Sequence, residues 1–277
     1  MTQLNPAIEL DSLDSENPLL FSIFTLVTNK EQYQEMLNSY QEAGFNGTNT
    51  EFLYTDNSET NKHDAFTGTR RFFNVAKGKY LILSHQDILL HDHKLPQLQQ
   101  VISEMDQYDP DWAILGNAGG IAPGKLAVRI TDYPYGENIT IGKLPAKVSC
   151  VDGNFMLIKR EANIGLSREL QGFHFYDIDL CLLADIMGYS TYVVNFHLHH
   201  AGGESVRNVG KKADESSPFT FNNQRKKFIL KYQRALVPRW MQTTCTMMHL
   251  SGSKLRNQLL NHKHIFSIQK RIHRWFK

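Results

Sequence analysis

Residues 77–88, KGKYLILSHQDI, contain the strand that decides the fold class of this chain. Within them, residues 80–83 form a short apolar run, which is typical of a parallel strand covered on both faces. A polar stretch follows at once and ends in the carboxylate of Asp87. Ligands of open α/β sheets bind beyond the carboxyl ends of the strands. This carboxylate is therefore placed to hold a cation, and the cation to hold phosphate oxygens.

The residues on both sides of this stretch alternate between strand and helix patterns. The first two predicted helices end at Gly44 and Gly78, where glycine suits a helix terminus. Such alternation over roughly 120 residues indicates an α/β fold with a mostly parallel sheet flanked by helices. The predicted strands are 20–27, 50–55, 80–83 and 112–116, and the predicted helices are 30–43, 64–76 and 95–105.

After residue 120 the alternation weakens. Residues 117–124 are rich in glycine and predict a loop, and residues 121–141 predict an extended, irregular region. Beyond them, the apolar runs predict short strands at 147–151, 155–158 and 191–194 and a helix at 177–187. From about residue 219 the pattern is helical and basic.

The small net charge of +2 conceals a strong asymmetry along the chain. Residues 1–204 contain 14 Lys and Arg against 26 Asp and Glu, whereas residues 205–277 contain 16 against 2. An acidic body with a basic tail points to an anionic partner for the tail. We therefore expect an irregular segment over 1–18, an α/β domain over 19–205 and a basic helical extension over 206–277.

The composition favours a cytoplasmic protein. The 277 residues, 41% of them hydrophobic, are ample for a large core. The first residues lack the basic and apolar regions of a signal peptide, and no apolar run approaches the ~18 residues of a membrane span. Cys150, Cys181 and Cys245 have neither CxxC nor metal-site spacing, so we expect reduced thiols.

Two carboxylate motifs could support chemistry. In the first, His85-Gln86-Asp87, the carboxylate would bind a divalent metal that carries a diphosphate, although a solvated turn also fits these residues. In the second, Asp177 and Asp179 stand at the start of a predicted helix, where carboxylates also cap the unpaired N–H groups. The two do not share a helix face. One of them can therefore face a substrate as a general base while the other caps.

Two further motifs are more ambiguous. After the last predicted strand, alternation places His197 and His199 on one side and His200 on the other, so His199 or His200 could complete a metal site with Asp87; an ordinary histidine-containing loop is the alternative. Asp56 could bind a base or ribose, or form an Asx turn. The sequence contains no GxGxxG after the first strand and no GxxxxGK[ST]. These absences argue against a dinucleotide oxidoreductase and a P-loop ATPase.

The order of these motifs resembles that of the family 2-like glycosyltransferases of the GT-A fold. The resemblance is strongest to the branch that has His-Gln-Asp where most members have Asp-x-Asp. It spans roughly residues 20–205 and rests on an ordered set of loose motifs. These are FTLVTN (24–29), YTD (54–56), AKGKYLILSHQD (76–87), GFHFYDIDLC (172–181), GY (188–189) and HHAGG (199–203).

The resemblance implies an inverting transfer from a nucleotide-sugar donor that depends on Mn²⁺ or Mg²⁺. It implies Asp177 as the catalytic base, and Asp87 with His199 or His200 as the metal ligands. His85 stands where the first carboxylate of Asp-x-Asp is usual, and Arg70 is an alternative to Arg71. By position, the donor-binding residues would be Thr28, Asn29, Asp56, Arg71, His85, Gln86 and Asp87, and the acceptor side would contain Asp152, His174, Tyr176 and Asp179.

The basic tail suggests a location for the acceptor. Residues 254–277 predict an amphipathic helix with Ile, Trp and Phe on one face and Lys and Arg largely opposite, which suits an anionic membrane surface. Packing on the α/β domain or on a second subunit is the alternative. No recognised nucleic-acid fold accompanies the tail, so we expect no nucleic acid partner.

The sequence therefore predicts a glycosyltransferase acting on a glycan or lipid-linked acceptor. A catalytically inactive sugar- or nucleotide-binding partner in a glycan-assembly complex is one alternative. A sugar nucleotidyltransferase is another, and the lack of a glycine-rich, basic loop after the first strand disfavours it.

Overall fold

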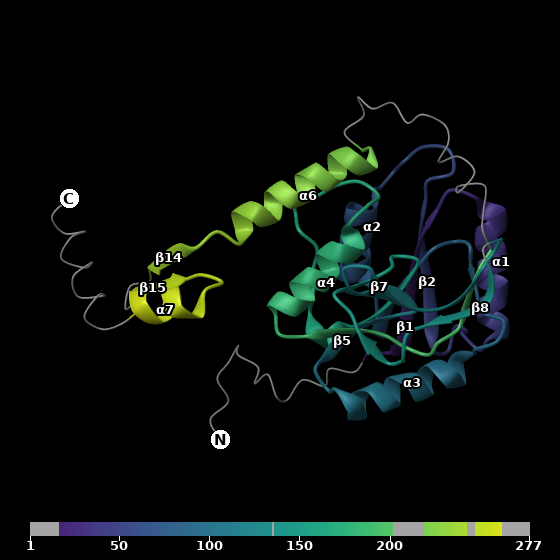
Figure 1. The fold of residues 1–277 in the computed structure, drawn as a ribbon. Coiled ribbons are helices and arrows are strands. Elements are labelled where there is room, and N and C mark those ends of the chain that lie inside the picture. Colours follow the sequence, from purple (N-terminus) through teal and green to yellow (C-terminus); the bar gives the residue numbers. More distant parts are fainter. Residues whose placement is uncertain (1–16, 135, 202–218, 243–246, 262–277) are drawn as a thin grey trace, which may run out of the picture. The chain divides into compact units, whose positions relative to one another are not determined.

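The computed structural model describes residues 17–134, 136–201, 219–242 and 247–261 of the chain (Figure 1). The chain divides into two compact units, Met1–Phe221 and Asn222–Lys277. The domain boundary predicted after residue 205 falls outside the described residues, so it stays a prediction.

The first unit is built on a seven-stranded mixed sheet. Strand β1 (Leu19–Val27) lies between β2 (Thr50–Asp56) and β3 (Gly78–Ser84), and both neighbours run parallel to it. Beyond β3, the antiparallel strand β11 (Phe155–Lys159) joins β5 (Trp112–Gly116), which in turn pairs in parallel with β12 (Ser190–Val193). The short strand β9 (Ala146–Lys147) closes the edge, and the order is β2-β1-β3-β11-β5-β12-β9.

Helices cover both faces of this sheet because the strand side chains alternate between them. Phe21, Ile23 and Val27 of β1 enter the core shared with α1 (Lys30–Glu42) and α3 (Leu95–Tyr108). On the opposite face, Phe24 stacks on Phe72 of α2 (Ala65–Val75) with 5.2 Å between ring centroids. The predicted α/β class with a mostly parallel, helix-flanked sheet is therefore confirmed.

The start of β3 depends on a glycine. A Cβ atom at Gly78 would lie 2.4 Å from the backbone carbon of Phe21 and the backbone nitrogen of Ser22. Only glycine allows β1 and β3 to approach this closely. Gly78 thus begins the strand, and the preceding helix is capped earlier, at Ala76.

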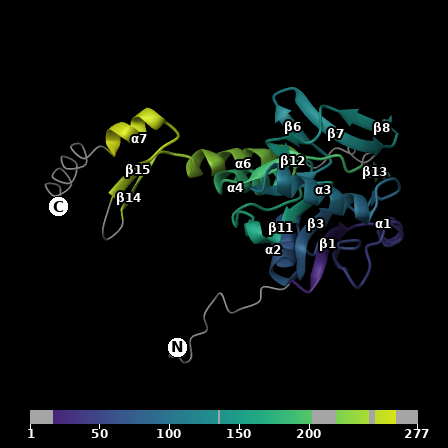
Figure 2. The same ribbon diagram turned by 90° about the horizontal axis from the view of Figure 1, so that it is seen from below.

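A second sheet lies where the sequence predicted irregular structure. Its strands are β10 (Cys150–Val151), β6 (Ala118–Ala122), β7 (Lys125–Asp132), β13 (Leu198–His200) and β4 (Ile88–Leu89), with β8 (Gly136–Ile141) on the side of β7 (Figure 2). The loop predictions for 117–124 and 121–141 are therefore wrong. Strand β7 buries only three of its eight side chains, so its apolar pattern is weak, and hydrogen bonds to neighbouring strands hold it instead.

The described part of the first unit also contains a short 3₁₀ helix at Arg160–Ala162 and helix α4 (Tyr176–Ile186), which the sequence placed one residue later. The second unit contains most of α6 (Phe221–Ala235), the hairpin β14 (Arg239–Gln242) and β15 (Met247–Leu250), and α7 (Lys254–Leu260). The extension is therefore not wholly helical as predicted.

Residues 262–277 of the predicted amphipathic helix lie outside the described residues. In the part of the chain that the structure describes, no helix has the length and apolarity to span a membrane. Cys150 and Cys181 are free thiols, and Cys245 is outside the described residues.

Candidate functional site

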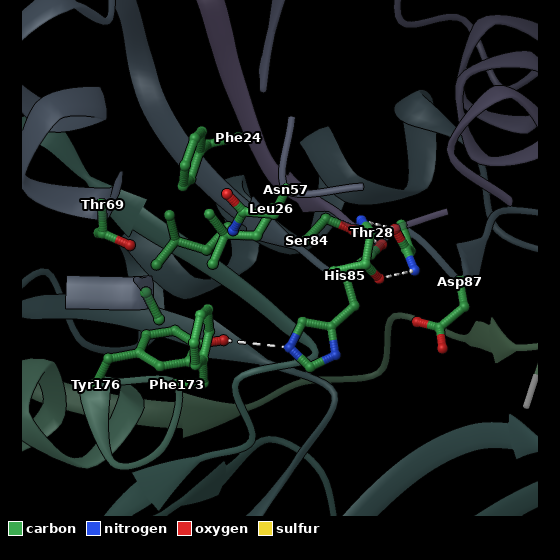
Figure 3. Close-up of a pocket in the computed structure, with 13 residues that line it drawn as sticks. Phe24, Leu26, Thr28, Asn57, Thr69, Ser84, His85, Asp87, Phe173 and Tyr176 are labelled. Carbon is green, nitrogen blue, oxygen red and sulfur yellow. Dashed lines mark hydrogen bonds between the residues drawn. The ribbon is translucent and has the colours of Figure 1, made fainter. Parts of the chain in front are cut away.

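A cavity of about 330 Å³ opens beyond the carboxyl ends of β1 and β3 (Figure 3). Phe24, Leu26 and Leu83 contribute apolar lining, and several polar side chains line the cavity as well. Small-molecule sites in α/β sheets are found at such strand ends and have similar volumes. The lining residues are Phe24, Leu26, Thr28, Asn57, Ala65, Thr69, Leu83, Ser84, His85, Gln86, Asp87, Phe173 and Tyr176.

His85 is fixed in the cavity by a chain of hydrogen bonds. The hydroxyl of Tyr176 donates to the backbone oxygen of Gly153 over 2.8 Å. Because that hydroxyl has one proton, it accepts from Nε2–H of His85, 3.2 Å away (Figure 3). His85 thus keeps Nδ1 as an acceptor. The His85 side chain lines the cavity and remains exposed, and desolvation by the surrounding groups lowers the pKa of this imidazole.

Asp87 and His200 form the charged end of the site. Asp87 is buried, and its Oδ2 lies 3.3 Å from Nε2 of His200. The other ring nitrogen of His200, Nδ1, lies 2.8 Å from Oδ1 of Asp132. Hydrogen bonding to Asp87 raises the pKa of His200 to about 9. Burial opposes the ionisation of Asp87, but His200 outweighs it and lowers the carboxyl pKa.

Asp177 occupies the first turn of α4 and has a raised pKa. Its Oδ1 accepts a hydrogen bond from the backbone N–H of Ile178 over 2.9 Å. Burial, reinforced by the nearby charge of Asp152, raises the pKa of the Asp177 carboxyl to about 6. A carboxylate with such a pKa can accept a proton near neutral pH. Asp152 is exposed and accepts from the backbone N–H of Asn154.

Three predicted donor-binding residues tie the end of β1 to the end of β3. The Gln86 amide oxygen accepts from the backbone N–H groups of Thr28 and Asn29, and its nitrogen donates to Thr28 Oγ1 and Gln32 Oε1. All four hydrogen-bonding positions of the amide are thereby occupied. The structure gives Gln86 a bracing role, and Asn29 caps α1 by accepting from Gln32. Of the three, only Thr28 and Gln86 line the cavity.

Asp56 and Arg71 lie in a neighbouring cavity of about 570 Å³ that shares Phe24 with the first. The Asp56 carboxylate accepts from the backbone N–H and hydroxyl of Ser58, which is the Asx turn foreseen as the alternative. It also pairs with Lys30 over 3.0 Å. These contacts hold the pKa of Asp56 far below its usual value. Arg70 instead donates to the backbone oxygen of Ser167.

Two residues predicted on the acceptor side, Asp179 and His174, contact other side chains of the protein. Asp179 is completely buried and binds the backbone N–H and hydroxyl of Ser167, both at 2.7 Å. A buried carboxylate needs such partners, so Asp179 holds a loop and does not face the cavity. The ring of His174 packs against Phe221 with centroids 5.3 Å apart.

The three late histidines divide between two faces of β13, as the strand alternation required. His200 faces Asp87, whereas His199 Nε2 lies 2.7 Å from Oδ2 of Asp92. His197 Nδ1 lies 2.8 Å from the same oxygen. Between the two candidates that the sequence left open, the structure brings His200 to Asp87 and leaves His199 elsewhere.

A related sequence matches this chain over most of its length. A protein of Fuscovulum blasticum named "ATP synthase subunits region ORF 6" is 32% identical over 245 residues, which cover 86% of this chain and 93% of that protein. The chain belongs to the family of that ORF 6 protein. The name of that protein does not state an activity. No family model matches the sequence.

Two solved structures show a low overall similarity to this ORF 6 family member. S. aureus TarS 1-349 in complex with UDP-GlcNAc is 14% identical, with 77% of this chain and 66% of that chain covered and a TM-score of 0.49. The Drosophila galactosyltransferase 7 in complex with manganese, UDP-Gal and xylobiose is 11% identical, with 88% and 100% covered and a TM-score of 0.42. Likeness at this level does not transfer an activity.

The structure also points to residues that the sequence did not indicate. Asp132 lies on β7, in the region predicted to be irregular, and no sequence signal connects it with His200. Asn154 has a buried side-chain oxygen that makes no hydrogen bond within the described residues. Asp92 stands between two histidines, His91 and His93. An acidic residue in such a histidine-rich stretch is a sequence signal for a metal site.

Proposed function

We propose that this protein is an inverting glycosyltransferase of the GT-A type. It would transfer a sugar from a nucleotide-sugar donor to a glycan or lipid-linked acceptor. One observation carries the proposal. One strand-end cavity is lined by the buried Asp87, which contacts the His200–Asp132 pair, and by His85 and Tyr176, and the raised-pKa carboxyl of Asp177 is the next residue after Tyr176 in α4.

Asp177 supplies the proton acceptor that inverting transfer requires. As the acceptor hydroxyl oxygen attacks the anomeric carbon, its proton passes to the Asp177 carboxylate. The bond from that carbon to the diphosphate breaks, and the nucleoside diphosphate leaves with the electron pair. Burial keeps the Asp177 pKa near 6, so the group is ionised at neutral pH yet basic enough to accept the proton.

The residues at the charged end of the cavity fit a divalent cation. Asp87 offers a buried carboxylate, and His200 presents Nε2 to the same point. Asp132 holds the other nitrogen of His200, which is the outer-shell carboxylate that metal-bound histidines commonly have. When bound, Mn²⁺ or Mg²⁺ would neutralise charge on the leaving diphosphate. Because His85 stands where the first carboxylate of Asp-x-Asp is usual, Asp87 would be the single carboxylate that this motif offers to the cation.

The remaining donor contacts follow from the two adjoining cavities. The diphosphate would lie near Asp87 and His200, and Thr28 would line its path. The nucleoside would extend past Phe24 into the second cavity, where Arg71 and the Asp56 turn lie. On the acceptor side, Tyr176 contacts both His85 and Gly153, and Asp152 is exposed.

A thermal-shift screen tests this proposal directly. A nucleotide-sugar that binds the folded state raises its apparent melting temperature, with the size of the shift set by its concentration relative to Kd. We expect a shift of several degrees for one nucleoside diphosphate sugar, larger with Mn²⁺ than with EDTA. Absence of a shift for every donor tested, with and without Mn²⁺, would contradict the proposal.

An inactive binding protein could use the same cavity, but it would need no proton acceptor. The raised pKa of Asp177 therefore favours the enzyme. Slow, metal-dependent hydrolysis of the donor in the absence of an acceptor would separate the two functions. A sugar nucleotidyltransferase remains disfavoured by the short Thr28-Asn29 turn after β1.

We further propose that residues 254–277 attach the protein to an anionic membrane surface. The support is the charge of the region, since residues 254–277 contain 7 Lys and Arg and no Asp or Glu. We expect the full chain to co-sediment with vesicles containing phosphatidylglycerol and a chain truncated before residue 254 to remain in solution. Equal sedimentation of both chains would rule out this attachment.

A further inference from the structure

We propose that Asp92, His197 and His199 form a second divalent-metal site, suited to Zn²⁺ and separate from the Asp87–His200 site. The three residues offer one carboxylate oxygen and two imidazole nitrogens, all within 4.8 Å of one another. Two imidazoles and a carboxylate are a set that Zn²⁺ accepts. No residue of the three takes part in the proposed transfer.

The two histidine nitrogens lie slightly closer to the Asp92 oxygen than the ligands of a zinc ion lie to one another. A small outward movement of one side chain would therefore admit the ion. His197 Nδ1 and His199 Nε2 lie 2.8 and 2.7 Å from the same Oδ2 of Asp92. Around a tetrahedral Zn²⁺ with bonds of about 2.0–2.1 Å, ligand atoms stand about 3.3 Å apart. The Asp92 side chain is 55% exposed, so it can move outward by that difference. Its exposure also leaves a coordination position open to water.

His197 has a hydrogen-bond partner, Thr131, that can bind it both in the presence and in the absence of the ion. Its Nε2 lies 2.9 Å from Oγ1 of Thr131, and that oxygen also accepts from the backbone N–H of Asn138. The threonine hydroxyl can donate its proton to Nε2 while Nδ1–H binds Asp92. Alternatively, it can accept from Nε2–H while bare Nδ1 binds a metal. His197 Nε2 therefore keeps a hydrogen-bond partner when Nδ1 gives up its proton to a metal.

Neighbouring groups hold both histidines in this geometry. His93 Nδ1 accepts from the backbone N–H of His197 over 2.9 Å, which ties the entry to β13 to the 91–93 stretch. The His91 ring packs edge-on against His199, with centroids 4.8 Å apart. A bound ion would join β13 to the residues after β4. Because His199 and His200 are adjacent on β13, the ion would also stabilise the strand that carries His200.

Zinc titration of the metal-stripped full chain tests the site. We expect one tight equivalent of Zn²⁺ by calorimetry at pH 7.5, with a melting temperature raised by several degrees. Asp92→Asn and His199→Gln should each weaken this equivalent by at least tenfold. The double variant Asp87→Asn, His200→Gln should keep it. His63→Gln, which removes a histidine outside the cluster, should also bind as the wild type does.

Two results would overturn the second site. One is unchanged zinc affinity in the Asp92→Asn variant, with circular dichroism to check that the variant is folded. The other is loss of the tight equivalent in the Asp87→Asn, His200→Gln variant, because the ion would then occupy the catalytic site. Neither measurement requires transfer activity, so both test the second site independently of the proposed function.

Discussion

The Asp177→Asn variant is expected to lose sugar transfer by about 10²–10⁴-fold in kcat while it binds the nucleotide-sugar as the wild type does. The amide has nearly the shape of the carboxyl but cannot accept the hydroxyl proton. Its oxygen can still accept from the N–H of Ile178, so the first turn of α4 should remain in place. Steady-state kinetics together with donor affinity by calorimetry measure the two effects separately.

The pH dependence gives a second signature of the same residue. Since only the ionised carboxylate is a base, transfer by the wild type should rise with pH through a midpoint near the Asp177 pKa of about 6 and then level off. The stability effect has the opposite sign. Because the folded-state pKa lies above the ordinary 3.8, the native state loses stability as pH rises from about 4 to about 6. At pH 7, the Asn variant should therefore melt at an equal or a slightly higher temperature.

Asp185→Asn is the matched control for this experiment. Asp185 lies on the same helix, is exposed, and lies outside the proposed site, so its replacement should leave kcat and the pH profile unchanged. Turnover retained by Asp177→Asn, or a pH midpoint that persists in its residual activity, would remove Asp177 from the mechanism.

Asp87→Asn should lower transfer by about 10²–10³-fold, and added Mn²⁺ should not restore it, because a charged ligand of the diphosphate cation is lost. Asp132→Asn is expected to act differently. Asp132 touches His200 and only positions it, so the variant should need about 10–100-fold more Mn²⁺ and recover much of its kcat at saturation. Initial rates measured across a Mn²⁺ titration distinguish the two patterns.

Asp111→Asn serves as the control for this pair, since Asp111 is exposed at the start of β5, away from the cavity. It should follow the wild-type Mn²⁺ curve. If all three variants followed that curve, the cation would be held elsewhere. If Asp132→Asn were as inactive at saturation as Asp87→Asn, Asp132 would itself be a ligand and the outer-shell role would be wrong.

The elements of the first 120 residues could be predicted from the sequence because they are locally determined. Strands β1, β3 and β5 carry mostly apolar runs, and α1 has an Asn29 cap and a glycine just past its end. The second sheet could not be predicted in this way. Its strand β6 contains two glycines, and β7 buries only three of its eight side chains, so pairing between strands decides their structure.

The candidate site shows the same division. Asp87 and Asp177 were identifiable because one ends a buried strand and the other begins a helix. The roles of Asp56 and Asp179 were not, since each depends on its partners: Ser58 and Lys30 bind the first, and Ser167 binds the second. Asp132 had no sequence signal at all.

The sequence by itself determined the alternation of β13, and with it that His199 and His200 point to opposite faces. Only the tertiary structure decided which of them meets Asp87. The antiparallel pairing of β13 with β4 and its parallel pairing with β7 bring Asp87, Asp132 and His200 together from three distant segments, and bring Asp92 to the other side. Side-chain direction is a local property of a strand, whereas the register between strands depends on the whole fold.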